Sequence, residues 1–143
     1  MKKTISSISA VLLAVLFVFS FAACSEKTEA TGVWESAAYL EDAEFGKGAK
    51  TVQVEVKAEE KSVTFTIHTD KEILGDALLE HELIAGEEGP YGLYVKTVNG
   101  ILADYDVNQC YWAVSKNGEA VATGVDGIEF LDGDHYELVY TQG

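Results

Sequence analysis

The stretch that decides the fold is residues 51–68, TVQVEVKAEEKSVTFTIH. Residues 51–57 and residues 62–68 each alternate apolar and polar side chains with a period of two, which is typical of strands that bury one face. The polar residues 58–61 between them predict a tight turn. We therefore predict a β-hairpin whose second strand points Val63, Phe65 and Ile67 into the core.

A helix is predicted directly after this hairpin. Thr69 and Glu72 have the spacing of a capping box, in which two side chains satisfy free backbone amides at a helix start. Apolar residues and one histidine then recur at helical spacing: Ile73, Leu74, Ala77, Leu78, His81 and Ile84. The helix should end near Gly86. Gly75 inside it indicates close packing of that turn against a sheet.

The rest of the chain predicts strands. Residues 91–98, 101–105, 111–116, 119–123 and 135–141 are expected as strands, with hairpin turns at Asn99-Gly100 and Asn117-Gly118. Before the first hairpin, residues 33–40 predict a short peripheral strand or an ordered arm, and residues 41–50 a loop. The order predicts an α+β fold, a β-grasp-like mixed sheet packed on one helix.

Composition narrows the classes of function. The chain has 143 residues and a formal net charge of −14, with 48% hydrophobic and 10% aromatic residues. That length and apolar content predict one folded domain. The negative charge argues against nucleic acid and anionic lipid head groups as partners, because phosphates would be repelled.

The N-terminus resembles a lipoprotein signal. Lys2 and Lys3 precede an apolar run over residues 10–21, and Ala22-Ala23-Cys24 resembles a lipobox. We predict a signal peptide over residues 1–23, a tether over 24–32 lipidated at Cys24, and a domain over 33–143 on the extracytoplasmic face of a bacterial membrane. The alternative is an ordinary signal peptide followed by an incidental cysteine.

Short motifs in order along the chain carry a family resemblance. VTFTIHTD at 63–70 and GEEGPYGLYV at 86–95 are followed by Asn99-Gly100, by ADYD at 103–106, by Tyr111-Trp112, by Asn117-Gly118, by TGV at 123–125 and by LDGD at 131–134. Together they resemble the transcobalamin-like C-terminal domain family over roughly residues 33–143. The resemblance implies a β-grasp fold of the soluble-ligand-binding type and a corrinoid such as cobalamin as ligand. Vertebrate carriers of this family also have a large helical-barrel domain, for which this sequence has no counterpart.

Aromatic residues are the candidate binding residues. Adjacent strand positions place Tyr111 and Trp112 on opposite faces, and an outward ring near other tyrosines would form a platform for a ring-shaped ligand or a sugar. The residues selected are Tyr91, Tyr94, Tyr105 and Trp112. The alternative is that most of these rings fill the core or pair across strands.

Other chemistry is poorly supported by the sequence. Asp104, Asp106 and Asn108 imitate the start of a calcium loop, but the glycine and the carboxylate that should follow are absent. The histidines at 68, 81 and 135 lack metal-ligand spacing, and Cys110, without a neighbouring base, is expected as a buried structural cysteine. Hydrolase and nucleotide-binding motifs are also absent, so no metal, resident cofactor or enzyme activity is predicted.

Two functions follow from these observations. The first is a lipid-anchored ligand-binding module that presents a small molecule, with cobalamin or another corrinoid as the specific ligand, to a transporter or partner. The second is a structural or protein-interaction module that binds a cell-envelope protein through a strand edge or an aromatic patch.

Overall fold

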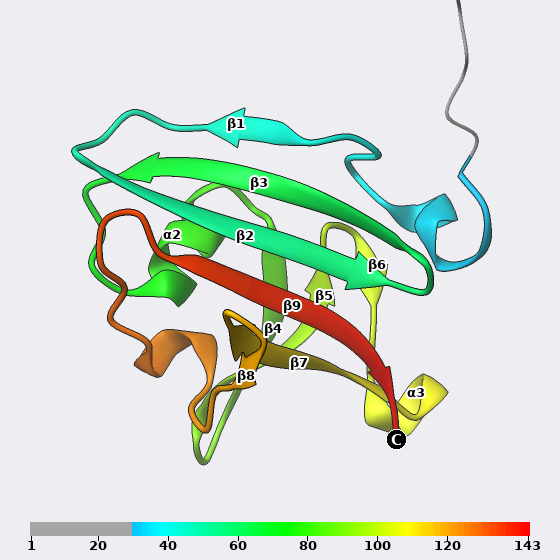
Figure 1. Ribbon diagram of the computed structural model, residues 1–143. Helices are drawn as coiled ribbons and strands as arrows, with labels where there is room; N and C mark the ends of the chain where they lie inside the picture. Colours follow the sequence, from blue (N-terminus) through cyan, green and yellow to red (C-terminus); the bar gives the residue numbers. More distant parts are fainter. Residues whose placement is uncertain (1–29) are drawn as a thin grey trace, which may run out of the picture.

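The computed structural model describes residues 30–143 (Figure 1). The predicted signal peptide and Cys24 lie outside the described residues. Among residues 30–143, no helix has the length and apolar character needed to cross a membrane.

The predicted hairpin is confirmed. Strands β2 (Lys50–Ala58) and β3 (Lys61–Thr69) pair antiparallel, with Val54 opposite Phe65. Every second side chain of both strands is buried on one face, as the alternation predicted: Val52, Val54, Val56, Ala58, Val63, Phe65 and Ile67. The hairpin therefore supplies one wall of the core.

Six strands form the main sheet, in the order β1-β3-β2-β9-β7-β8. The outer members are β1 (Ala43–Phe45) and β8 (Glu119–Ala120). Strand β9 (His135–Gln142) lies parallel to β2 and antiparallel to β7 (Cys110–Lys116). The last strand, β9, thus lies between β2 of the hairpin and β7. This is the β-grasp arrangement, and it confirms the predicted α+β class.

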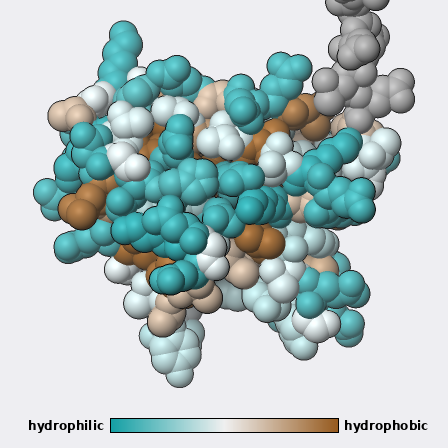
Figure 2. Space-filling model, in the orientation of Figure 1, coloured by the Kyte–Doolittle hydropathy of each residue, from teal (hydrophilic) through white to brown (hydrophobic). Residues whose placement is uncertain are grey.

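A helix and a second sheet cover one face of the main sheet (Figure 1). They are α2 (Leu74–Glu80) and the three-stranded sheet β4 (Ile84–Gly89), β5 (Gly92–Val98) and β6 (Ile101–Leu102). The core lies between these layers. Figure 2 shows the opposite face of the main sheet, where hydrophilic side chains predominate.

The predicted helix cap and helix end are wrong. Thr69 ends β3, and its hydroxyl accepts a hydrogen bond from the Lys71 amide at 3.0 Å, while α2 begins at Leu74 without a side-chain cap. The helix ends at Glu80 because Glu82 takes a left-handed conformation with φ of 55°. The chain then turns, so that Ile84 begins β4 instead of continuing the helix.

Gly75 packs closely, as the sequence predicted, but its partner is a 3-10 helix and not the predicted sheet. A Cβ at this position would lie 3.1 Å from backbone atoms of Asp126, which belongs to the 3-10 helix η3 (Val125–Gly127). Helix α2 and η3 are therefore in direct contact.

Of the two alternatives for residues 33–40, the ordered arm is confirmed and the short strand is not, because the 3-10 helix η2 (Gly32–Ser36) stands there. The predicted loop over residues 41–50 contains β1, which pairs parallel to β3. Trp34 is buried, and its indole N–H donates to the Ala58 carbonyl at 2.9 Å. The segment packs on the domain as an ordered arm.

Both Asn-Gly turns are confirmed, since each of their four residues has a positive φ. The strand after Asn99-Gly100 is shorter than predicted, because β6 ends at Leu102 and Tyr105 opens the short helix α3 (Tyr105–Asn108). The Asp104 carboxylate caps α3 by accepting the Asp106 amide at 3.0 Å. Residues 104 and 105 therefore begin a helix and do not extend the strand.

Candidate functional site

The β4–β5 hairpin carries the most exposed aromatic side chain among the described residues. Its turn holds Pro90 and Tyr91, and the Tyr91 side chain is 98% exposed. Tyr94 follows on β5 and is 42% exposed. An aromatic ring held almost wholly in water at a hairpin tip is available to a ligand without any rearrangement of the core.

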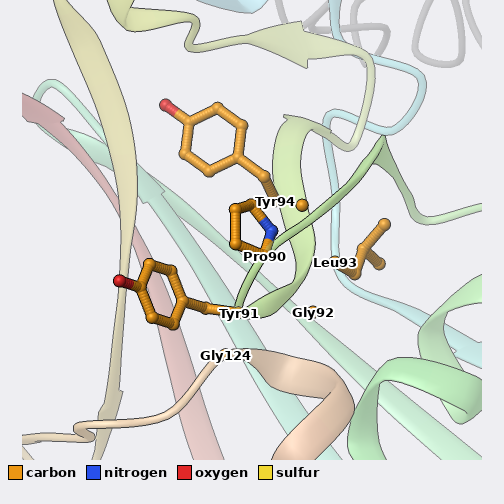
Figure 3. A pocket seen from close by; sticks show the side chains of 7 residues that line it. Pro90, Tyr91, Gly92, Leu93, Tyr94 and Gly124 are labelled. Carbon is orange, nitrogen blue, oxygen red and sulfur yellow. The ribbon is translucent and has the colours of Figure 1, made fainter.

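A pocket of about 320 Å³ lies beside this tip (Figure 3). Figure 3 shows the Tyr91 and Tyr94 side chains extending on the same side of the hairpin, with Gly124 on a separate segment below. The lining residues are Gly89, Pro90, Tyr91, Gly92, Leu93, Tyr94 and Gly124. We call this set the hairpin pocket. Its volume is at the lower end of the range for small-molecule sites.

Two polar contacts hold the hairpin. Near the tip, the Asp126 carboxylate accepts the Leu93 amide at 2.8 Å. Further along, the Lys96 ammonium lies 3.1 Å from Glu87 of β4 and 3.2 Å from Asp104 before α3. These contacts join β5 to the body of the domain through Asp126 and Asp104, and link β4 to β5 through Glu87.

The charge of Lys96 is reinforced by its partners. Hydrogen bonds to Glu87 and then to Asp104 raise the pKa of Lys96 above its ordinary value. The same ammonium lies 5.9 Å from the centre of the Tyr94 ring, a cation–π distance. The Lys96 ammonium thus lies over one ring of the hairpin pocket.

The structure brings together two of the four predicted binding residues. Tyr91 and Tyr94 line the hairpin pocket. Tyr105 is 55% exposed on α3, beside the C-terminus at the far end of β7 (Figure 1). Trp112 faces the core at 7% exposure and packs edge-on against Tyr140, so its expected outward orientation is wrong and Tyr111, at 40%, is the outward ring of that pair.

Sequence reasoning missed Gly124 and Asp126 as parts of this site. Both belong to a segment more than thirty positions from the hairpin turn, and no local pattern connects them. The positive φ of Gly92, 102°, is the structural reason that the turn requires glycine there. The Gly-Pro-Tyr-Gly run at 89–92 was the one local signal of a tight, exposed turn.

None of the three histidines lines the hairpin pocket. His68 contacts Glu44 and lies 3.0 Å from the Thr51 hydroxyl, while His135 lies 3.4 Å from Glu55. His81 packs against the Phe45 ring. Across residues 30–143, no three or more His, Cys, Asp or Glu side chains come together as a possible metal-binding group.

Cys110 is buried, as the sequence indicated, with 5% exposure. Its thiol donates to the Asn108 carbonyl at 3.4 Å. The neighbouring Tyr140 has its pKa raised to about 12, first by its hydrogen bond with Cys110 and then by burial. Tyr140 is therefore protonated at neutral pH, and its contact with Cys110 serves the packing of β7 against β9.

A second, polar pocket of about 290 Å³ lies on the outer face near β1. Its lining residues are Asp42, Ala43, Glu44, Gln53, Thr64 and Thr66. The carboxylates are already engaged, because Asp42 accepts the Thr64 amide at 2.8 Å and Glu44 contacts His68. The hairpin pocket, with its two accessible rings, is the better candidate for a ligand.

Comparisons with known proteins give structural relatives. No protein-family model matches the chain. No curated protein matches it either. Among solved structures, haptocorrin in complex with Cbi matches with a TM-score of 0.50 and 18% identity over 68% of this chain and 26% of haptocorrin. At that identity the likeness shows the fold alone.

A second solved structure is much more similar in sequence. It is described as a "putative metal binding protein" from Ruminococcus gnavus, and it matches with a TM-score of 0.63 and 36% identity. The match covers 66% of this chain and 99% of the Ruminococcus gnavus protein. The chain described here belongs to the same family as that Ruminococcus gnavus protein.

Proposed function

We propose that this chain is a non-catalytic, lipid-anchored extracytoplasmic module that binds a small ligand at the hairpin pocket and presents it to a transporter or partner. The observation that carries the binding role is the Tyr91 side chain, 98% exposed beside a pocket whose other ring, Tyr94, is 42% exposed. Burying exposed aromatic surface is a favourable contribution to binding. Anchoring at Cys24 rests on the lipobox in the sequence.

A corrinoid is the ligand we propose. The conjugated ring of a corrinoid can pack against two tyrosine rings and a proline. The descriptions of the two structural relatives support this choice, because haptocorrin was solved with Cbi and the Ruminococcus gnavus protein is described as metal-binding. A corrinoid brings its cobalt already chelated, so binding it requires no cluster of metal-ligating side chains. The pocket volume of about 320 Å³ accommodates one edge of such a ligand.

The test is a titration of the purified protein with cobinamide and cobalamin, followed by calorimetry and by the corrin absorption spectrum. Tyr91→Ala should weaken binding about tenfold, the value of one lost aromatic contact of roughly 1.4 kcal/mol. Tyr105→Ala, which truncates an exposed tyrosine on α3, is the matched control and should leave the affinity unchanged. Absence of heat and of a spectral change at high micromolar ligand would refute the corrinoid proposal.

A protein-interaction module is the second candidate, and one observation favours it. Exposed apolar side chains gather near α3, where Leu102, Tyr105 and Val107 are 43%, 55% and 69% exposed. Such a patch is typical of protein contacts. Under this alternative, Val107→Asp would abolish capture of a cell-envelope protein, while Tyr91→Ala would not.

A further inference from the structure

We propose that Asp126 is the positioning residue of the hairpin pocket. Its carboxylate fixes the tyrosine hairpin relative to Gly124 and so sets the shape of the pocket before a ligand arrives. The inference deepens the proposed function and rests on it for the ligand. The arrangement of Asp126 itself is a separate observation.

The contact is built into both segments. One carboxylate oxygen of Asp126 accepts the Leu93 amide at 2.8 Å. The carboxylate also occupies the position where a Cβ of residue 92 would stand, so the absence of a side chain at Gly92 is what admits it. The other oxygen would lie 3.2 Å from a Cβ on Gly124. Asp126 therefore contacts both sides of the pocket.

The backbone at Asp126 is packed on the core. It lies in η3, whose first residue, Val125, is fully buried. The next residue after η3, Ile128, accepts the Leu74 amide of α2 at 2.9 Å through its carbonyl, and Gly75 packs against η3. The carboxylate is thus mounted on the helix layer of the core, whereas residues 85–89 of the hairpin are exposed. An exposed hairpin that is held by an acceptor packed on the core is preorganised for binding.

The experiment combines amide exchange with cobinamide binding in the full chain. Asp126→Ala should speed exchange of the Leu93 amide about tenfold, the effect of losing one hydrogen bond to a charged acceptor. It should also weaken cobinamide binding about threefold or more. Asp126→Asn keeps an oxygen acceptor, so it should keep most of the protection of the Leu93 amide and most of the cobinamide affinity. A role that depended on the negative charge would lose both in this variant.

Asp42→Ala is the matched control, because the Asp42 carboxylate also accepts a backbone amide at 2.8 Å but on the opposite side of the main sheet. It should speed exchange at Thr64 and leave Leu93 and cobinamide affinity unchanged. Unchanged Leu93 exchange in Asp126→Ala overturns the inference, and so does faster exchange with unaltered cobinamide affinity. If the wild-type chain does not bind cobinamide, the corrinoid proposal fails and Leu93 exchange alone decides the role of Asp126.

Discussion

Replacing Trp34 by alanine tests whether the N-terminal arm is part of the folded domain. The indole is 1% exposed, and its N–H donates to the Ala58 carbonyl of β2 at 2.9 Å. Further contacts join the arm to the β5–β6 turn, where the Asn99 side chain accepts the Tyr39 amide and donates to the Tyr39 carbonyl, both at 2.9 Å. Trp34→Ala removes the largest apolar group of the arm and leaves a buried carbonyl without its donor.

The expected cost follows from burial. Removing a fully buried tryptophan side chain costs about 3–5 kcal/mol, and leaving a buried acceptor unsatisfied adds about 1 kcal/mol. Domains of this size have a free energy of unfolding of about 5–15 kcal/mol. A loss of 4 kcal/mol should lower the melting temperature by about 12–20 °C. If the arm detaches as a unit, the loss of unfolding free energy cannot exceed the free energy with which the arm packs on the domain.

Urea denaturation, monitored by far-ultraviolet circular dichroism and by fluorescence, gives the free energy of unfolding. The sequence has two tryptophans, so Trp112 becomes the one tryptophan reporter in the variant. Ser36→Ala, on the exposed side of η2, is the control and should change stability by less than about 0.5 kcal/mol. A Trp34→Ala variant within 1 kcal/mol of the wild type, with equal protection of the arm from protease, would refute our account of the arm.

Two further substitutions test packing and charge. Gly75→Ala should destabilise the domain by about 1 kcal/mol, because crowding of its Cβ against the η3 backbone exceeds the gain in helix propensity; a rise in melting temperature would contradict the contact. The hydrogen bond from Lys57 lowers the pKa of Glu137. Its contribution to stability is therefore present above the ordinary pKa of 4.5 and lost as the pH falls through the lowered value. Glu137→Gln should flatten this acid limb in urea titrations between pH 3 and 6, and an unchanged slope would count against the ion pair.

The features that the sequence predicted correctly are local. The alternation in residues 51–68 requires only that one strand face be buried, and the structure confirms it. The turns at Asn99-Gly100 and Asn117-Gly118 could be predicted because asparagine and glycine tolerate the positive φ that such turns require. The sequence also indicated close packing at Gly75, because glycine inside a helix lowers its stability, but it did not indicate that the partner is η3.

The features that failed depend on strand pairing and packing that the residue pattern does not show. Ile84 continues the helical spacing, yet it belongs to β4 because the strand pairs with β5. Gly86 is needed there since a Cβ would collide with the Tyr94 carbonyl, and no pattern near Gly86 shows this. Trp112 was expected to face outward because alternation alone does not say which face of β7 meets the core.

The same distinction explains which rings can contribute to binding. A ring that is already buried, such as Trp112 at 7% exposure, gains no further burial when a ligand arrives. Tyr91, at 98% exposure, can transfer nearly its whole ring from water to a contact, a gain of up to about 4 kcal/mol at 25 cal/mol per Å². Part of that gain is lost wherever the hairpin must first be ordered. The Asp126 carboxylate already holds the Leu93 amide, so under the role proposed for Asp126 part of that cost is met during folding, before a ligand reaches the exposed ring.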